Sequence, residues 1–101
     1  MPARHHTYRI TVEHIVSARE SEPVHPTPLV FDAQNHDDLF RIVERARTAT
    51  GLPPDEAAAM AVGLKLLSEI ALTHRRNDLF SDLANDLGTF IGRLKAQRQT
   101  A

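Results

Sequence analysis

A histidine and two carboxylates stand side by side in the segment Asn35–Phe40, which has the sequence NHDDLF. His36, Asp37 and Asp38 carry side-chain types that bind metal ions or transfer protons. If the segment is helical, however, consecutive side chains point about 100° apart. Helical metal pairs need a spacing of three or four residues, and the sequence contains no His-x-x-x-His motif. The three residues therefore give only a limited signal for chemistry.

The same residues fit the beginning of a helix. Asparagine is a preferred N-cap residue, because its side-chain oxygen accepts a backbone N–H of the first turn and stabilises the helix by about 1 kcal/mol. With Asn35 as the cap, Asp37 and Asp38 lie where the helix dipole favours negative charge. We therefore expect Asn35–Asp38 to begin the first helix, and we keep His36, Asp37 and Asp38 as candidate ligand-binding residues.

Basic residues could form a surface for phosphate groups. Arg41 and Arg45 fall in the first expected helix, and Arg75 and Arg76 end the second. The 12 basic residues are nevertheless balanced by 13 acidic ones, giving a net charge of −1. Proteins that bind nucleic acids usually carry a basic excess on one face. We therefore expect no nucleic-acid partner.

Histidines outside the first segment have no spacing typical of metal ligands. His5 and His6 adjoin the N-terminus, where we expect a solvated arm. His14 and His25 can approach each other if the residues around them form a β-hairpin.

Other patterns typical of catalysis or cofactor binding are missing from the sequence. It contains no Gly-x-Ser-x-Gly motif, its four glycines are scattered, and it has no cysteine. Lys65 and Glu69 are four residues apart, which fits a surface ion pair on a helix. We therefore expect a protein that is not an enzyme and that binds no metal and no cofactor.

Two strands are expected in the first third of the chain. Residues 7–16 alternate between apolar and polar side chains, and residues 28–33 form a second short strand. They most simply make an antiparallel pair joined by the proline-containing loop of residues 17–27. A two-stranded sheet is only marginally stable in water. We therefore expect a helix to cover one face of the sheet, and a second copy of the chain to join one of its edges.

Three helices are expected after the strands. The first runs from Asn35 to the breakers at residues 51–54, and the second begins at Pro54, where a proline loses no hydrogen bond. This second helix is apolar almost all round, which indicates a central position. Within it, Ala59 and Gly63 present small side chains that allow a neighbour to pack closely. Asn77 or the residue after it can cap the third helix.

The predicted fold class is therefore α+β, with a two-stranded antiparallel sheet packed against three helices in the order β-β-α-α-α. We expect a single domain over residues 1–101, with a flexible arm at residues 1–6 and a frayed tail at residues 96–101. The N-terminus has no apolar stretch typical of a secretory signal. The longest apolar run, Ala57–Leu64, is too short to cross a bilayer. We therefore expect a cytoplasmic protein without a membrane partner.

Three segments resemble a small bacterial family known only as a domain of unknown function. They are the strand Arg9–Val12, the segment Asn35–Asp38 and the stretch Ala61–Leu66. The resemblance covers roughly residues 5–95, and it implies a compact bacterial α+β domain. It supplies no activity, substrate or catalytic residue.

Self-association is the leading functional hypothesis at this stage. An exposed sheet edge without convergent chemistry favours a non-catalytic protein–protein interaction module, and we expect a homodimer that also binds a protein of unknown identity. The alternative is a small-ligand or metal-binding protein with its site near His36, Asp37 and Asp38.

Overall fold

The structure is a computed structural model that describes residues 4–97. Two strands precede three helices, in the order β1 (His6–Val12), β2 (Leu29–Asn35), α1 (Leu39–Ala49), α2 (Pro54–Thr73) and α3 (Asp78–Gln97). The predicted α+β class and the β-β-α-α-α order are confirmed. Residues 1–3 of the predicted arm and residues 98–101 of the predicted tail lie outside the described residues.

The two strands form an antiparallel hairpin with one apolar and one polar face. Residues directly opposite each other in such a pair share a face of the sheet. On the polar face, Arg9 and Asp32 form an ion pair of 3.1 Å. The apolar face consists of three cross-strand pairs, which are Tyr8 with Ala33, Ile10 with Phe31, and Val12 with Leu29.

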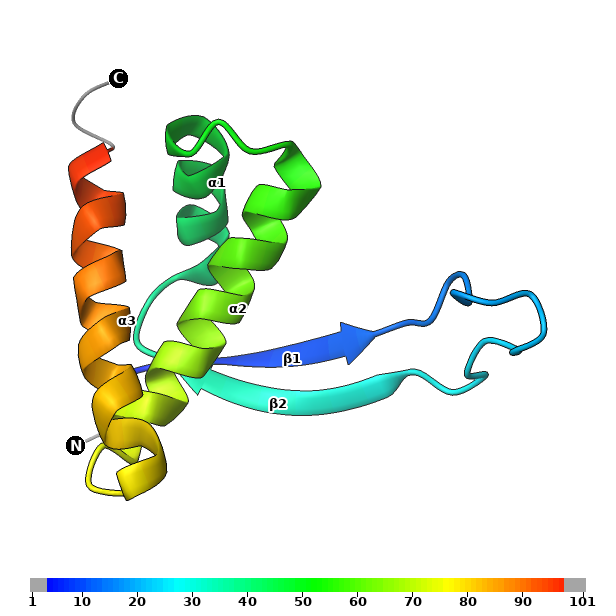
Figure 1. The fold of residues 1–101 in the computed structure, drawn as a ribbon, viewed down its shortest axis with the longest axis horizontal. Helices are drawn as coiled ribbons and strands as arrows, with labels where there is room; N and C mark the ends of the chain where they lie inside the picture. Colours follow the sequence, from blue (N-terminus) through cyan, green and yellow to red (C-terminus); the bar gives the residue numbers. More distant parts are fainter. Residues whose placement is uncertain (1–3, 98–101) are drawn as a thin grey trace.

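The hairpin projects from the helices as a long arm (Figure 1). The hairpin arm is defined here as β1, β2 and the connection between them, residues 13–28. The expected helical cover reaches only its inner end, where β2 meets α2. Farther out, Val12, Leu29 and Phe31 are 52%, 60% and 41% exposed. The radius of gyration is accordingly 16.0 Å, whereas a compact domain of this length has about 13 Å.

The central position predicted for α2 is confirmed, because α2 packs against α1, α3 and β2. It begins at Pro54, as the sequence predicts. Before it, Gly51 turns the chain with a φ of 74°, in the left-handed region that glycine tolerates. Asn77 precedes α3, and its side-chain oxygen accepts the Leu79 N–H at 2.9 Å, which confirms the predicted cap. Among the described residues, no helix combines the length and apolar character needed to cross a bilayer.

The core between α1 and α2 is built largely from alanine. Ala46, Ala57 and Ala61 are buried together. The prediction that Ala59 and Gly63 give the close approach is wrong, because residues two positions apart on a helix lie about 200° apart. The described residues place no atom within 4 Å of the position that a Cβ on Gly63 would occupy. The larger side chains of Ile42, Val43 and Met60 pack against this cluster and are only partly buried.

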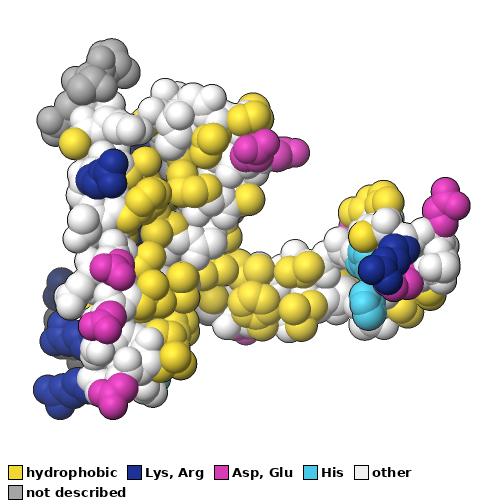
Figure 2. Space-filling model, viewed as in Figure 1, with side chains coloured by type: hydrophobic (Ala, Val, Ile, Leu, Met, Phe, Trp, Pro, Cys, Tyr) yellow, Lys and Arg dark blue, Asp and Glu magenta, His cyan; other side chains and the backbone are white. Residues whose placement is uncertain are grey.

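Large apolar side chains remain exposed on the helices. Leu67, Ile70 and Leu72 of α2 are each more than 40% exposed, and Phe40 of α1 is 76% exposed. Figure 2 shows hydrophobic side chains gathered over the helices and along the hairpin arm on one face of the molecule. Monomeric soluble proteins rarely expose large contiguous apolar patches, so this distribution is typical of a surface that binds another molecule.

Candidate functional site

The candidate residues His36, Asp37 and Asp38 form the link between β2 and α1, and they precede the helix. Asn35 is the last residue of β2, and α1 begins only at Leu39. The N-cap is Asp38, whose side-chain oxygen accepts the backbone N–H groups of Phe40 at 3.0 Å and Arg41 at 3.4 Å. The prediction that Asn35 caps the first helix is therefore wrong by three residues.

Asn35 instead joins β2 to α2. It lies two residues after Ala33, so its side chain points to the apolar face of the hairpin, where the inner end of that face meets α2. The residue is only 1% exposed. Its Nδ2 donates to the backbone carbonyl of Lys65 at 2.9 Å, and its Oδ1 accepts the Asp37 N–H at 3.0 Å. A buried amide bonded at both ends is a structural tie between the strand and the helix.

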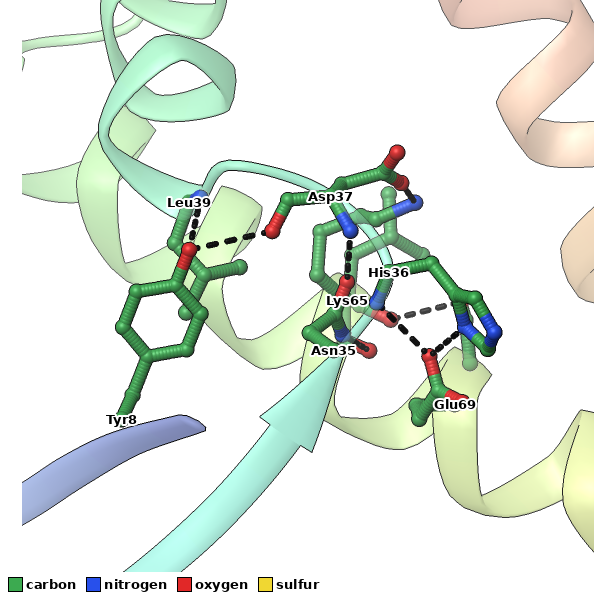
Figure 3. Close-up of polar contacts among 9 residues, drawn as sticks. Tyr8, Asn35, His36, Asp37, Leu39, Lys65 and Glu69 are labelled. Carbon is green, nitrogen blue, oxygen red and sulfur yellow. Dashed lines mark hydrogen bonds and ion pairs between the residues drawn. The ribbon is translucent and has the colours of Figure 1, made fainter. Parts of the chain in front are cut away.

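The Tyr8 hydroxyl makes a second tie, which the sequence analysis missed (Figure 3). It donates to the Asp37 carbonyl and accepts the Leu39 N–H, both at 3.1 Å. One side chain of β1 thus satisfies a backbone amide in the first turn of α1. The only signal in the sequence is the alternation of β1, which places Tyr8 on the apolar face beside the link.

His36 and Asp37 each bond a different residue of α2. The His36 Nδ1 lies 3.0 Å from the Glu69 Oε1, and the same carboxylate oxygen accepts the His36 backbone N–H at 3.3 Å. The Asp37 carboxylate forms an ion pair with Lys65. The hydrogen bond from Lys65 lowers the pKa of Asp37, against an opposing effect of partial burial, with smaller contributions from the charges of Lys65 and Lys95. The predicted surface pair between Lys65 and Glu69 is therefore replaced by two pairs that fasten the link to α2.

The three candidate side chains diverge from one another. His36 points to Glu69 and Asp37 points to Lys65 (Figure 3). The Asp38 side chain bonds the first amides of α1. Within residues 4–97, no three His, Cys, Asp or Glu side chains are arranged so that they could hold a metal ion. The structure thus groups His36 and Asp37 around α2 and separates Asp38 from them.

A cavity of about 350 Å³ lies beside this link, between α2 and α3. His36, Lys65 and Glu69 contribute to its polar side, whereas α3 contributes apolar residues such as Leu87 and Ile91. The His5 ring meets the His36 ring edge-on, with centroids 5.7 Å apart. Among the described residues, the buried Nδ1 of His5 has no hydrogen-bond partner.

The other sequence candidates lie elsewhere. His14 and His25 do approach each other, as the hairpin hypothesis predicts: the His14 Nδ1 accepts the His25 backbone N–H at 2.9 Å. Arg41 and Arg45 lie on α1, whereas Arg75 and Arg76 occupy the turn between α2 and α3. The four arginines are therefore divided between two parts of the helical body.

Comparisons with known proteins agree with this description. The sequence profile of a domain of unknown function with a solved structure, DUF3861, matches residues 6–96. A crystal structure of a protein of unknown function (eca1910) from Pectobacterium atrosepticum SCRI1043 is 30% identical, with a TM-score of 0.76, over 91% of this chain and 98% of that chain. No curated protein matches. The chain therefore belongs to the DUF3861 family, as the resemblance to a domain of unknown function predicts.

Proposed function

We propose that the chain is a non-catalytic protein–protein interaction module that self-associates through the apolar face of its hairpin arm. That exposed face is the observation that carries the proposal. Its strands are paired from His6 to Val12 in an unbroken register, so the face is fully formed. Its outer residues Val12, Leu29 and Phe31 nevertheless remain open to solvent. Burial of such side chains stabilises by about 25 cal/mol per Å², which favours a partner that covers them.

The exposed surface area supports the same proposal. The chain exposes 8129 Å². A compact monomer of 11.3 kDa is expected to expose about 5,700 Å², which is roughly 2,400 Å² less. A stable interface buries about 800 Å² on each partner. The excess is therefore larger than one interface requires.

A second copy of the chain is the partner that this face fits best. The six residues of the face are uncharged, so they present no charge pattern that would select a different protein. A two-stranded sheet also gains stability from additional strands or from a second layer. A second arm supplies both, and an interface between identical copies needs only one self-complementary surface.

The polar link between β2 and α1 supports a non-catalytic reading. Catalysis requires an acid, a base or a nucleophile that is available to a substrate. Asn35 and Tyr8 bond backbone groups, Asp38 caps α1, and Asp37 pairs with Lys65. These side chains connect β1, β2, α1 and α2, which is a structural task.

The experiment compares adjacent residues on opposite faces of β2. Phe31→Asp places a charge on the apolar face, whereas Val30→Asp places the same charge on the polar face of the same strand. Sedimentation equilibrium from 1 to about 200 µM should show a dimer for the wild type and for Val30→Asp, and a monomer for Phe31→Asp. Circular dichroism checks that both variants keep their helices. A wild type that stays monomeric at the highest concentration, or two variants that behave alike, would contradict the proposal.

A second candidate function is the binding of a small polar ligand in the cavity beside His36. The lining of this cavity, where His36, Lys65 and Glu69 stand opposite apolar residues of α3, is the observation that favours it. A thermal-shift screen with acidic and basic metabolites, and with zinc and nickel, tests this function. A ligand that raises the melting temperature of the wild type and leaves that of His36→Ala unchanged supports it. An identical response from both proteins rules out this site.

A further inference from the structure

The apolar face of the hairpin arm is too small to hold a dimer together alone. Seven residues at about 3.3 Å per residue, on two strands about 4.8 Å apart, give a patch of roughly 220 Å². An ordinary stable interface needs about 800 Å² on each partner. A dimer built on the arm must therefore extend onto another surface of the same chain.

The apolar surface continues from the arm onto α1. An open hollow of about 570 Å³ lies where β1 meets the helices, and it is called the elbow here. Tyr8 and Ile10 of the arm line it together with Phe40 and Val43 of α1. The Tyr8 and Phe40 rings lie 6.3 Å apart, so the two apolar surfaces meet at this point.

The far end of the arm carries exposed apolar residues as well. In the tip, residues 13–28, the side chains of Ile15 and Val16 are 71% and 77% exposed. The tip is held by the bond from the His25 N–H to the His14 Nδ1 and by an ion pair between Arg19 and Glu22. The tip therefore presents apolar side chains on a loop with contacts of its own.

Charge decides which way two arms can run. The tip contains three glutamates and one arginine, so its net charge is −2. Two arms that run in the same direction would bring two such tips together, and like charges repel. Around the elbow, by contrast, three arginines are balanced by three carboxylates, namely Arg9, Arg41 and Arg47 with Asp32, Asp38 and Glu44. An acidic tip is better accommodated at an elbow than at another tip.

We infer that two copies lay the apolar faces of their arms together in opposite directions, so that each tip enters the elbow of the other copy. The inference rests on the proposed self-association and adds its geometry. A two-fold axis makes every contact occur twice. This axis passes near the cross-strand pair of Val12 and Leu29, which lies midway between the elbow and the tip. The exposed Ile15 and Val16 then cover Phe40 of the partner, and the angle between arm and helices in each copy is filled (Figure 1).

Cysteine cross-linking tests this arrangement, because the natural chain contains no cysteine. Single variants place a thiol at the tip (Val16→Cys), at the rim of the elbow (Glu44→Cys), at the middle of the arm (Val12→Cys) or on α3 (Asp86→Cys). Equimolar mixtures are treated with a short bis-maleimide and examined on a denaturing gel. We expect Val16→Cys to link with Glu44→Cys and Val12→Cys to link with itself. Val16→Cys should not link with Asp86→Cys, because α3 lies on the far side of the helices from the arm (Figure 1).

The other outcomes separate the inference from the proposed function. If Val16→Cys links with itself and not with Glu44→Cys, the arms run in the same direction; the inference then fails, and self-association stands. Equal linking of Val16→Cys to Glu44→Cys and Asp86→Cys shows random collision and also overturns the inference. The inference is also overturned if the wild type is dimeric and no pair of cysteine variants is cross-linked. If the wild type is monomeric in sedimentation, the proposed function itself fails.

Discussion

Two regions of the molecule differ in how many of their groups find partners within the chain. They are the polar link between β2 and α1 and the outer part of the hairpin arm. At the link, Asn35 is buried with its side-chain oxygen and nitrogen both bonded, and Tyr8 closes a gap between a strand and a helix. On the outer arm, well-paired strands hold an apolar face in water. The link is satisfied by contacts within one chain, whereas the outer arm keeps Val12, Leu29 and Phe31 exposed.

This difference is the one expected between a structural site and the interaction surface that we propose. Histidine and carboxylates drew attention to the link, yet their partners are the backbone and α2. The arm has an apolar face whose outer residues are exposed, and burial of such side chains would be favourable. In this chain the residues most typical of an active site bond the backbone and α2, and the proposed function rests on the apolar strand pair instead.

The largest expected effect on stability comes from replacing leucine with alanine, a change that can be made both beside the link and on the arm. Leu39 lies at the link and is 6% exposed, whereas Leu29 lies on the arm and is 60% exposed. Leu39→Ala should lower the free energy of unfolding by about 3 kcal/mol at any protein concentration, because it leaves a cavity. Leu29→Ala should cost less than about 0.5 kcal/mol in dilute protein, as exposed substitutions usually do. Urea unfolding followed by circular dichroism measures both.

Repeating that measurement at high protein concentration sharpens the comparison. Association stabilises the folded chain by mass action, so the cost of Leu29→Ala should grow with concentration while that of Leu39→Ala stays constant. Equal and constant costs for the two variants would show that the arm is already complete in a single chain.

Asn35 gives the next largest effect. Asn35→Ala removes both bonds of a buried amide and leaves the Asp37 N–H and a lone pair of the Lys65 carbonyl without them. An unsatisfied buried group costs about 1–3 kcal/mol, so a total loss of about 3 kcal/mol is expected. Gln34→Ala, one residue earlier and exposed, should change stability by less than about 0.5 kcal/mol. If the two variants unfold at the same urea concentration, the Asn35 side chain does not stabilise the fold by joining β2 to α2.

Local patterns in the sequence predicted the local features of this fold. Pro54 begins α2, Asn77 caps α3, and His14 meets His25 across the hairpin. Each of these depends on residues close in sequence or on simple strand pairing. Capping of α1 by Asn35 had the same kind of support, yet Asp38 takes that role because β2 continues for two residues beyond its predicted end.

Long-range contacts explain what could not be predicted. Asn35 bonds Lys65, thirty residues away, and no local pattern distinguishes an asparagine that caps a helix from one that is buried against another helix. The alternation of β1 indicated a half-buried strand, and the expected cover was one of the chain's own helices. An alternating pattern indicates that one face of a strand is apolar. It does not indicate whether the residues that bury this face belong to the same chain or to another.

The smallest expected effect concerns the charge of Asp37. Its pKa is lowered in the folded chain, chiefly by the hydrogen bond from Lys65. An aspartate in an unfolded chain has a pKa of about 3.9. Because the folded value is lower, the pair stabilises the fold above that pH, and this stabilisation is lost as the pH falls through the folded pKa. Half of the Asp37 side chain is exposed, so solvent limits the size of the effect.

Lys65→Met keeps the aliphatic part of the side chain and removes the charge, so the pKa of Asp37 should rise towards its ordinary value. The stabilisation that Asp37 contributes above its unfolded pKa should then shrink, so acidification should remove less stability from this variant than from the wild type. Lys95→Met is the matched control, because Lys95 lowers the pKa of Asp37 only through its more distant charge and should produce a smaller rise. Carboxyl-carbon NMR titration follows Asp37 directly in all three proteins. If the pKa of Asp37 is the same in Lys65→Met as in the wild type, the ion pair does not fasten the link to α2. The link would then have one stabilising contact fewer, and it would differ less from the exposed arm.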